Sequence, residues 1–321
     1  MKRKRILFIT LFLSEGGAER TVSILSSELA KRGLDVHLIL FDRYPKEYAL
    51  AREVKLHELR APEGWCRLDS ICKKVGRMRK IIKEIAPDII IPFLAIPTFY
   101  AYLASRGLKN CTFISTVRNN PLLYPESALK RNVVNLITKK SDKIMLQTPE
   151  QEMYFPHKLS SKIFVIPNPV KQEILDTVYE CRPEVKRIIT IGRFFKQKNH
   201  SLLIRAFGKL SEKWKDLRLV IYGEGRERKN LEKLIKELRL TKRVHLPGKI
   251  ANVHEALAKG DVFVLSSDYE GLPNTLIEAM AVGLPCISTA CPTGPRDLIQ
   301  NGRDGLLVRV GDEAGLAGAM E

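Results

Sequence analysis

The segment RILFITLFLSEGGAERTVSILSSELAKRGLDVHLILF, residues 5–41, contains a complete strand–helix–strand pattern. Its two ends, residues 5–10 and 35–41, are apolar runs with the length and composition of buried strands. Two adjacent glycines predict a tight turn after the first run, and residues 18–33 form a helical pattern that ends in a glycine. The segment therefore predicts two parallel strands joined by a crossover helix.

The same alternation continues along the chain and is interrupted by one polar stretch with few strand signals, residues 171–187. Alternation of this kind is typical of parallel sheets with helices on both faces. We therefore expect an α/β protein of two doubly wound, Rossmann-like domains, residues 1–170 and 171–321, which face each other across an interdomain cleft. The further strand-like runs are DIIIPF (88–93), CTFIST (111–116), KIMLQ (143–147), KIFVIP (162–167), IITIGR (188–193), LRLVIYGEG (217–225), RVHLPG (243–248), DVFVLSS (261–267) and LPCISTA (284–290).

The composition is that of a globular protein with a basic surface. Of the 321 residues, 45% are hydrophobic and 28% are charged, and the net charge is +18. A basic surface suits nucleic acid, an anionic membrane face or phosphorylated small molecules, and charge alone does not distinguish them. Residues 251–321 are nevertheless acidic overall. Six cysteines without a CxxC pair predict reduced thiols and a cytoplasmic location.

The N-terminus starts with basic residues and a short apolar run, MKRKRILFITLFL (1–13). A signal peptide would also need a small-residue cleavage site, which is missing, so we expect this run to form a first buried strand. The other apolar stretch, residues 88–104, contains two prolines and is shorter than the roughly 20 residues that span a bilayer. The sequence therefore predicts no transmembrane segment.

Three turns that follow strand-like runs carry glycines or cations, at the position where open α/β sheets bind ligands. The first, Gly16-Gly17, would let a phosphate or a sugar approach the backbone. In the second, GRFFKQKN, Arg193 and Lys198 stand where they could bind a diphosphate. The third, YGEGRER (222–228), has an incomplete dinucleotide fingerprint. We therefore exclude a nicotinamide site and expect its glycines to admit a flat base or a neighbouring backbone.

The segment DVFVLSSDYEGLPNTLIEAMAVG, residues 261–283, places two carboxylates on either side of a helix start. Asn274 is the predicted N-cap of a helix over residues 275–282. Glu270 then lies in the loop before the helix, and Glu278 lies one turn inside it. The helix N-terminus between them offers N–H groups to an anion. One carboxylate for sugar hydroxyls, one for ribose hydroxyls and an anion site between them fit a sugar nucleotide.

These segments together resemble the GT-B-fold retaining glycosyltransferases of family 4, which use nucleotide-sugar donors. EGLPNTLIE (270–278) matches the E-x7-E motif of that family, and GRFFKQKNHSLLIRAF (192–207) matches its phosphate-binding segment. IPNPV (166–170), NGRDGLLV (301–308) and the SEGGAER loop match further family segments in the expected order. The resemblance covers essentially the whole chain.

The resemblance implies a role for each candidate residue. Arg193 and Lys198 would bind the donor diphosphate, Glu270 would hold the donor sugar, and these three are the candidate catalytic residues. Glu278 would hydrogen-bond the ribose. Further donor contacts would come from Gly16 and Gly17 at the diphosphate, from Gly223, Lys249 and Ile250 near the base, and from Gly271, Leu272, Asn274, Thr275 and Leu276 at the sugar and phosphates.

The implied activity is that of a hexosyltransferase. It would move a hexosyl or N-acetylhexosaminyl group from a nucleotide sugar, UDP-linked on family grounds, to a glycan acceptor. A lipid-linked acceptor in surface polysaccharide or oligosaccharide assembly is the expected case. Two cations and a helix N-terminus can hold the charge of a leaving diphosphate. Because no Asp-x-Asp motif occurs, we expect transfer without a metal or other cofactor.

Two features depart from the family pattern. Many members carry a histidine after the strand that matches CTFISTV, whereas this chain has Arg118 there, which could meet a phosphate of the acceptor. The chain also stops at DEAGLAGAME, where the family usually continues through more helices, so we expect either a fragment or an abbreviated C-terminal end.

The segment RLDSICKKVGRMRKIIKEI, residues 67–85, has apolar residues at helical spacing and basic residues elsewhere on the wheel. It predicts either a packed helix with a solvated basic face or a surface that docks on the anionic inner face of the cell membrane. Two alternatives to a membrane-associated transferase stay open: a soluble transferase for a small molecule or sugar phosphate, and a non-catalytic basic module that binds nucleic acid. No nucleic-acid-binding motif is recognisable, so we expect no such partner.

Overall fold

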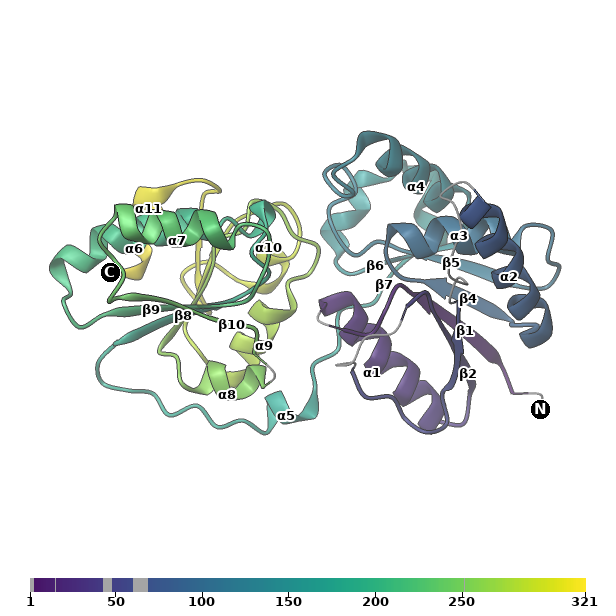
Figure 1. Cartoon of the computed structure of the whole chain (residues 1–321), viewed down its shortest axis with the longest axis horizontal. Coiled ribbons are helices and arrows are strands. Elements are labelled where there is room, and N and C mark those ends of the chain that lie inside the picture. Colours follow the sequence, from purple (N-terminus) through teal and green to yellow (C-terminus); the bar gives the residue numbers. More distant parts are fainter. Residues whose placement is uncertain (1–2, 15, 43–47, 60–68, 251) are drawn as a thin grey trace. The chain divides into compact units, whose positions relative to one another are not determined.

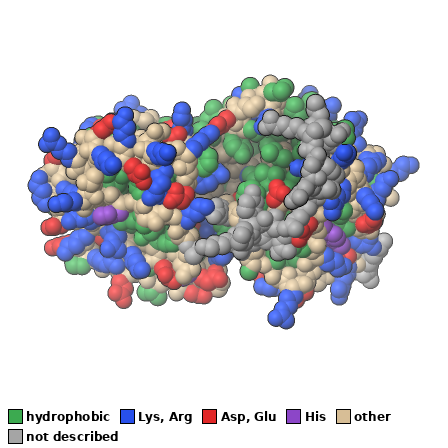
Figure 2. Space-filling view, viewed as in Figure 1, with side chains coloured by type: hydrophobic (Ala, Val, Ile, Leu, Met, Phe, Trp, Pro, Cys, Tyr) green, Lys and Arg blue, Asp and Glu red, His purple; other side chains and the backbone are tan. Residues whose placement is uncertain are grey.

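The computed structural model describes residues 3–14, 16–42, 48–59, 69–250 and 252–321. The chain divides into two compact units, Met1–Pro169 and Val170–Glu321. Each unit holds one sheet with helices on both faces (Figure 1). Every strand pair in the described residues is parallel, as the alternating sequence pattern predicted. Lys and Arg side chains are spread over the visible face of both units (Figure 2).

Within its described residues, the first unit contains a seven-stranded sheet in the order β3-β2-β1-β4-β5-β6-β7. Helix α1 packs on one face, and α2, α3 and α4 cover the other (Figure 1). The elements are β1 (Arg5–Thr10), α1 (Gly17–Lys31), β2 (Asp35–Leu40), β3 (Lys55–Glu58), α2 (Asp69–Ile85), β4 (Ile89–Pro92), α3 (Ala95–Ser105), β5 (Thr112–Thr116), α4 (Ala128–Lys140), β6 (Lys143–Leu146), the 3-10 helices η1 (Pro149–Tyr154) and η2 (His157–Lys162), and β7 (Ile163–Val165).

Strand β1 shows why a continuous apolar run forms the centre of this sheet. Its side chains alternate between two cores: Leu7 and Ile9 pack under α2 and α3, whereas Ile6 and Phe8 pack under α1. All four are buried, because helices cover both faces. Each such side chain contributes about 1.5–3 kcal/mol to folding by leaving water.

Within its described residues, the second unit contains a six-stranded sheet in the order β10-β9-β8-β11-β12-β13. Helices α6, α7 and α11 pack on one face, and α5, α8 and α9 pack on the other (Figure 1). The elements are α5 (Gln172–Leu175), β8 (Arg187–Ile191), the 3-10 helix η3 (Lys196–Lys198), α6 (His200–Lys213), β9 (Arg218–Tyr222), α7 (Arg228–Glu237), β10 (Val244–Gly248), α8 (Val253–Ala258), β11 (Val262–Leu265), α9 (Asn274–Val282), β12 (Cys286–Thr289), α10 (Pro295–Leu298), β13 (Leu306–Val308) and α11 (Glu313–Met320).

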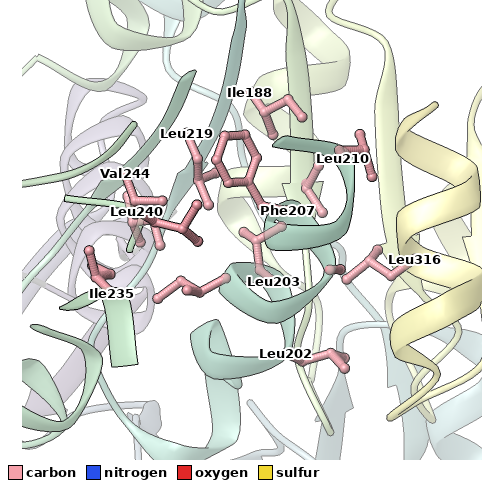
Figure 3. Packing of buried hydrophobic residues seen from close by; sticks show 14 of the residues in the cluster. Ile188, Leu202, Leu203, Phe207, Leu210, Leu219, Ile235, Leu240, Val244 and Leu316 are labelled. Atoms are coloured by element: carbon pink, nitrogen blue, oxygen red, sulfur yellow. The ribbon is translucent and has the colours of Figure 1, made fainter. Parts of the chain in front are cut away.

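The core beneath α6 fixes this helix to the sheet. Leu203 and Phe207 of α6 are completely buried against Ile188 and Leu219 of the strands (Figure 3). Leu316 of α11 packs into the same cluster (Figure 3). The start of α6 and the turn before it are therefore held in a fixed position on the sheet.

The strand order reverses at β8 in the second unit. The chain runs outward from β8 to β9 and β10 and then returns to the other side of β8 as β11. Ligands of open α/β sheets bind at the carboxyl ends of the strands at such a reversal. The turns that follow β8 and β11 consequently lie side by side. The first unit has the same kind of reversal at β1, between β2 and β4.

Two local expectations were wrong. Strand β3 was missed, because KLHE is a short edge strand with one apolar residue and therefore no apolar run. Helix α9 begins at Asn274, so its N-cap is Pro273 and not Asn274. Gly283 ends this helix in the left-handed conformation, as predicted.

No described helix combines the length and the apolar character that crossing a bilayer requires.

Candidate functional site

Lys198 and Glu270 meet at the strand-order reversal of the second unit. Lys198 ends the turn η3 that follows β8, and Glu270 lies in the loop that follows β11. The Nζ atom of Lys198 lies 2.6 Å from Oε1 of Glu270. The two side chains are only 15% and 7% exposed, respectively. Because a buried charge is costly without its partner, this pair fixes the positions of both groups.

The Glu270 loop is held by further hydrogen bonds. Ser267 Oγ donates to Oε1 of Glu270 at 2.6 Å, and Thr293 Oγ1 donates to the Glu270 carbonyl at 2.8 Å. Gln197 Nε2 donates to the Tyr269 carbonyl at 2.8 Å. These donors come from the ends of three neighbouring strands, so the carboxylate is oriented before any ligand binds.

The turn before α6 is tied to the same loop. Asn199 adopts the left-handed conformation, accepts the Leu202 N–H with its side-chain oxygen and thereby caps α6. Its Nδ2 atom also donates to Oδ1 of Asp268 at 2.7 Å. Burial raises the pKa of the Asp268 carboxyl, and the Asn199 hydrogen bond opposes that effect. Both sequence neighbours of Lys198, Gln197 and Asn199, therefore hydrogen-bond to the Glu270 loop and fix the backbone on either side of Lys198.

The predicted anion site at the start of α9 follows Glu270 in the sequence, and Gly271 of this loop lies against Gly294. A Cβ atom at Gly294 would lie 2.2 Å from the carbonyl oxygen of Gly271, and Gly294 has a φ of +82°. Glu278 lies one turn inside α9 and is only 4% exposed. Leu272 and Leu276 are both buried in the free protein.

Arg193 is exposed and lies two residues after the end of β8. Its guanidinium carbon is 5.0 Å from the centre of the Phe195 ring. Arg226, from the loop after β9, lies 5.1 Å from the same ring. The sequence analysis did not select Arg226. Its position in YGEGRER, at the end of a strand that pairs with β8, could have indicated that it lies near Arg193.

His200 was also missed. It is buried at the start of α6, edge-on to Phe194 with the ring centres 5.4 Å apart. Burial lowers the pKa of its imidazole to about 4, and the nearby Lys198 ammonium acts in the same direction. His200 is therefore neutral at neutral pH and adds no charge beneath Lys198.

The glycines after β9 serve the neighbouring backbone. A Cβ atom at Gly223 would lie 1.9 Å from the carbonyl oxygen of Gly192, and the φ of Gly223 is +149°. Of the two explanations that the sequence left open, this contact supports the approach of a backbone. Lys249 and Ile250 follow β10, and Ile250 packs against the core beneath α8 and α9.

The remaining candidates lie in the first unit. Gly16 is the N-cap of α1, and Gly17 is the first helical residue. A Cβ atom at Gly16 would lie 1.7 Å from Oε2 of Glu19, so that side chain occupies the space beside the glycine. Arg118 follows β5 and contacts Asn168. Gly16, Gly17 and Arg118 are thus placed in one unit, and the other candidates in the second.

Comparison with known proteins agrees with this arrangement. Residues 15–173 match the family model Glycosyltransferase Family 4, and residues 172–321 match Glycosyl transferases group 1. Two relatives from Campylobacter jejuni align with nearly the whole chain. One, named GalNAc-alpha-(1->4)-GalNAc-alpha-(1->3)-diNAcBac-PP-undecaprenol alpha-1,4-N-acetyl-D-galactosaminyltransferase, is 30% identical over 99% of this chain and 88% of its own length.

The other relative is named N-acetylgalactosamine-N,N'-diacetylbacillosaminyl-diphospho-undecaprenol 4-alpha-N-acetylgalactosaminyltransferase. It is 31% identical over 94% of this chain and 85% of its own length. Sucrose-phosphate synthase from Thermosynechococcus elongatus shares the fold, with a TM-score of 0.84 at 20% identity over 99% of this chain and 89% of that structure. The chain therefore belongs to glycosyltransferase family 4 and is a glycosyltransferase with the GT-B fold.

Proposed function

We propose that this protein transfers an N-acetylhexosaminyl or hexosyl group from a UDP-sugar to a lipid-linked glycan acceptor in surface glycan assembly, with retention of anomeric configuration. Both Campylobacter relatives are named as N-acetylgalactosaminyltransferases that act on undecaprenol-linked glycans. The observation that carries the proposal is the buried Lys198–Glu270 pair, which lies at the strand-order reversal of the second unit.

In the proposed reaction, the bond between the sugar C1 and the β-phosphate oxygen breaks while the acceptor oxygen bonds to C1 on the same face. The acceptor proton passes to the departing phosphate oxygen. Arg193, Lys198 and the N-terminus of α9 stabilise the charge on the leaving diphosphate. Glu278 binds the ribose, and the α9 loop from Gly271 onward supplies backbone contacts.

Glu270 holds the hydroxyls of the donor sugar and is not assigned as a nucleophile. Its Oε1 atom already accepts hydrogen bonds from both Lys198 and Ser267. A carboxylate in that environment is a weak nucleophile but a well-oriented acceptor for sugar hydroxyls. Because cations and helix N–H groups supply the stabilisation, the proposed transfer needs no metal or other cofactor.

The test is donor hydrolysis and transfer with a panel of UDP-, GDP- and ADP-sugars in the presence of EDTA. We expect UDP-sugar turnover that EDTA does not change. Arg193→Ala should lower kcat/KM by about 100- to 1,000-fold, the effect of removing one donor to a developing anion. Arg205→Ala, an exposed arginine on α6, is the matched control and should retain activity. Turnover that occurs only without EDTA would contradict metal independence. Turnover of no donor, with or without EDTA, would contradict the transferase proposal itself.

In the same proposal, the protein binds to the surface of an anionic membrane. Two surfaces of the first unit could make that contact, the basic face of α2 and the surroundings of α4. In α2, Met78, Ile82 and Ile85 are buried in the core, so this helix presents its basic face and not its apolar one. Residues 67 and 68 of the predicted pattern lie outside the described residues. The basic face therefore supplies electrostatic attraction only.

Exposed apolar side chains lie around α4. They come from the turn after β5, from α4 itself and from η1, and two hydrogen bonds connect these segments: Asn135 Nδ2 to the Pro121 carbonyl at 3.0 Å, and Asn120 Nδ2 to Tyr154 Oη at 3.0 Å. Basic residues accompany them on α4. We name this surface the α4 patch; its apolar members are Leu122 (59% exposed), Leu123 (45%), Leu129 (76%), Leu136 (54%) and Met153 (71%).

Replacing Leu122 and Leu129 by Gln should weaken binding to vesicles of 30% anionic lipid, measured by co-sedimentation, by roughly 10-fold or more. Each exposed leucine can bury apolar area in the bilayer interface, which stabilises binding by about 1–2 kcal/mol. The unfolding temperature should not change, since both side chains are exposed. The double variant Lys73→Gln/Arg77→Gln is the comparison and should weaken binding mainly at low salt. Equal sedimentation of the leucine variant and the wild type would contradict a role for the α4 patch.

A further inference from the structure

Four side chains converge at the carboxyl edge of the sheet in the first unit. Phe93 follows β4 directly, Arg118 follows β5, Gln147 follows β6 directly, and Asn168 follows β7. These strands are consecutive neighbours in the sheet. Residues that are distant in the sequence are therefore gathered at the edge where open α/β sheets bind ligands.

Neutral groups surround the Arg118 guanidinium. Its Nη2 atom donates to Oδ1 of Asn168, and Gln147 Nε2 donates to the same oxygen at 2.8 Å. Its carbon Cζ lies 5.0 Å from the centre of the Phe93 ring. The buried Nε atom has no hydrogen-bond partner within the described part of the chain. No described carboxylate forms an ion pair with Arg118.

This environment is unfavourable for a cation without a ligand. A desolvated charge is stabilised by a counter-charge, and Arg118 instead has an amide oxygen and an aromatic face. Loss of water lowers the pKa of Arg118 to about 9, so the group remains charged at neutral pH. The Phe93 ring fixes the plane of the guanidinium, and the geometry leaves N–H groups for an acceptor. A planar, oriented guanidinium is well suited to bind phosphate oxygens.

We propose that Arg118, held by Phe93, Gln147 and Asn168, forms an anion subsite in the first unit that binds a diphosphate oxygen of a substrate. The inference rests on the proposed function, in which two diphosphates occur. One belongs to the nucleotide-sugar donor and the other links the acceptor glycan to its lipid. The same chemistry would recognise either, and kinetics distinguish them.

The experiment compares wild type with Arg118→Gln and Arg118→Lys. The substrates are a UDP-sugar, an acceptor glycan on a lipid diphosphate, and the same glycan on a neutral aglycone. If the subsite binds the acceptor, Arg118→Gln raises the KM for the diphosphate acceptor about 10- to 100-fold more than the KM for the neutral one, the effect of losing a charged hydrogen bond. If it binds the donor, the donor KM and the UDP inhibition constant rise by that factor with both acceptors. Arg118→Lys should recover part of either effect.

A purely structural role would give a different result. Two outcomes would overturn the anion subsite. In one, Arg118→Gln has the same KM as wild type for each of the three substrates. In the other, its KM rises equally for both acceptors while its donor KM does not change. A direct readout separates this failure from failure of the proposed function. In an Arg193→Ala background, calorimetric binding of inorganic pyrophosphate should persist, and adding Arg118→Gln should weaken it about 10-fold or more. Binding that is unaffected by that second change would also overturn the proposal.

Discussion

Lys198→Met should abolish sugar transfer and also destabilise the second unit. The change leaves the Glu270 carboxylate buried and without its cation, and breaking a buried ion pair in this way costs about 3–5 kcal/mol. It also removes one of the two cations proposed to hold the leaving diphosphate, so kcat should fall by about 1,000-fold or more. Donor hydrolysis measures the first effect. Urea denaturation of the full chain, followed by hydrogen exchange of peptides from the second unit, measures the other.

The double variant Lys198→Met/Glu270→Gln separates the two effects. Neutralising both partners removes the unpaired charge, so most of the lost stability should return while transfer stays absent. The exposed pair Lys209–Glu313 is the matched control: Nζ and Oε1 are 2.9 Å apart, but the side chains are 55% and 33% exposed. Lys209→Met should therefore change the unfolding free energy by less than about 1 kcal/mol. Recovery of activity in the double variant would show that the pair is structural and does not act on the donor.

Those features of the fold that depend on local patterns could be predicted from the sequence. Continuous apolar runs predicted eleven of the thirteen described strands, because a strand buried on both faces needs no polar residue. The other two, β3 and β13, are short edge strands with one neighbour each, so neither carries such a run; only the family resemblance of residues 301–308 indicated β13. The start of α9 was displaced by one residue, because both Pro273 and Asn274 are acceptable at that boundary.

The candidate site was predictable in its residues but not in their partners. The spacing of Glu270 and Glu278 around a helix start is a local property, and so is the position of Lys198 after a strand. Lys198 bonds to Glu270 because β8 and β11 are neighbours in the sheet. The order of the strands along the sequence does not reveal that pairing. Thr293 is 23 residues from Glu270 and carries no motif that would identify it. Likewise, the neutral surroundings of Arg118 come from three other strands.

Gly223→Ala should destabilise the second unit by about 4 kcal/mol and raise the donor KM. Two costs add: a non-glycine residue at a φ of +149° is strained by about 1–3 kcal/mol, and the new Cβ would lie 1.9 Å from the carbonyl oxygen of Gly192. A backbone atom cannot rotate away as a side chain would, so the strand exit must shift, at a further cost of about 1–3 kcal/mol. Gly192 directly precedes Arg193, so the shift displaces the guanidinium proposed to bind the diphosphate.

Gly302→Ala is the matched control, since Gly302 also has a positive φ, +79°, but no atom lies within 4 Å of the position that its new methyl group would take. It should lose only about 1–2 kcal/mol of stability, the cost of the left-handed conformation alone, and keep its donor KM. Urea denaturation and donor kinetics on both variants give the comparison. If Gly223 served a nucleotide base instead of the neighbouring backbone, Gly223→Ala would raise the donor KM while matching Gly302→Ala in stability. That outcome would refute a backbone role for the glycines after β9. A clash with the neighbouring backbone is present in the free protein and lowers its stability, whereas a clash with a ligand arises only when the ligand binds.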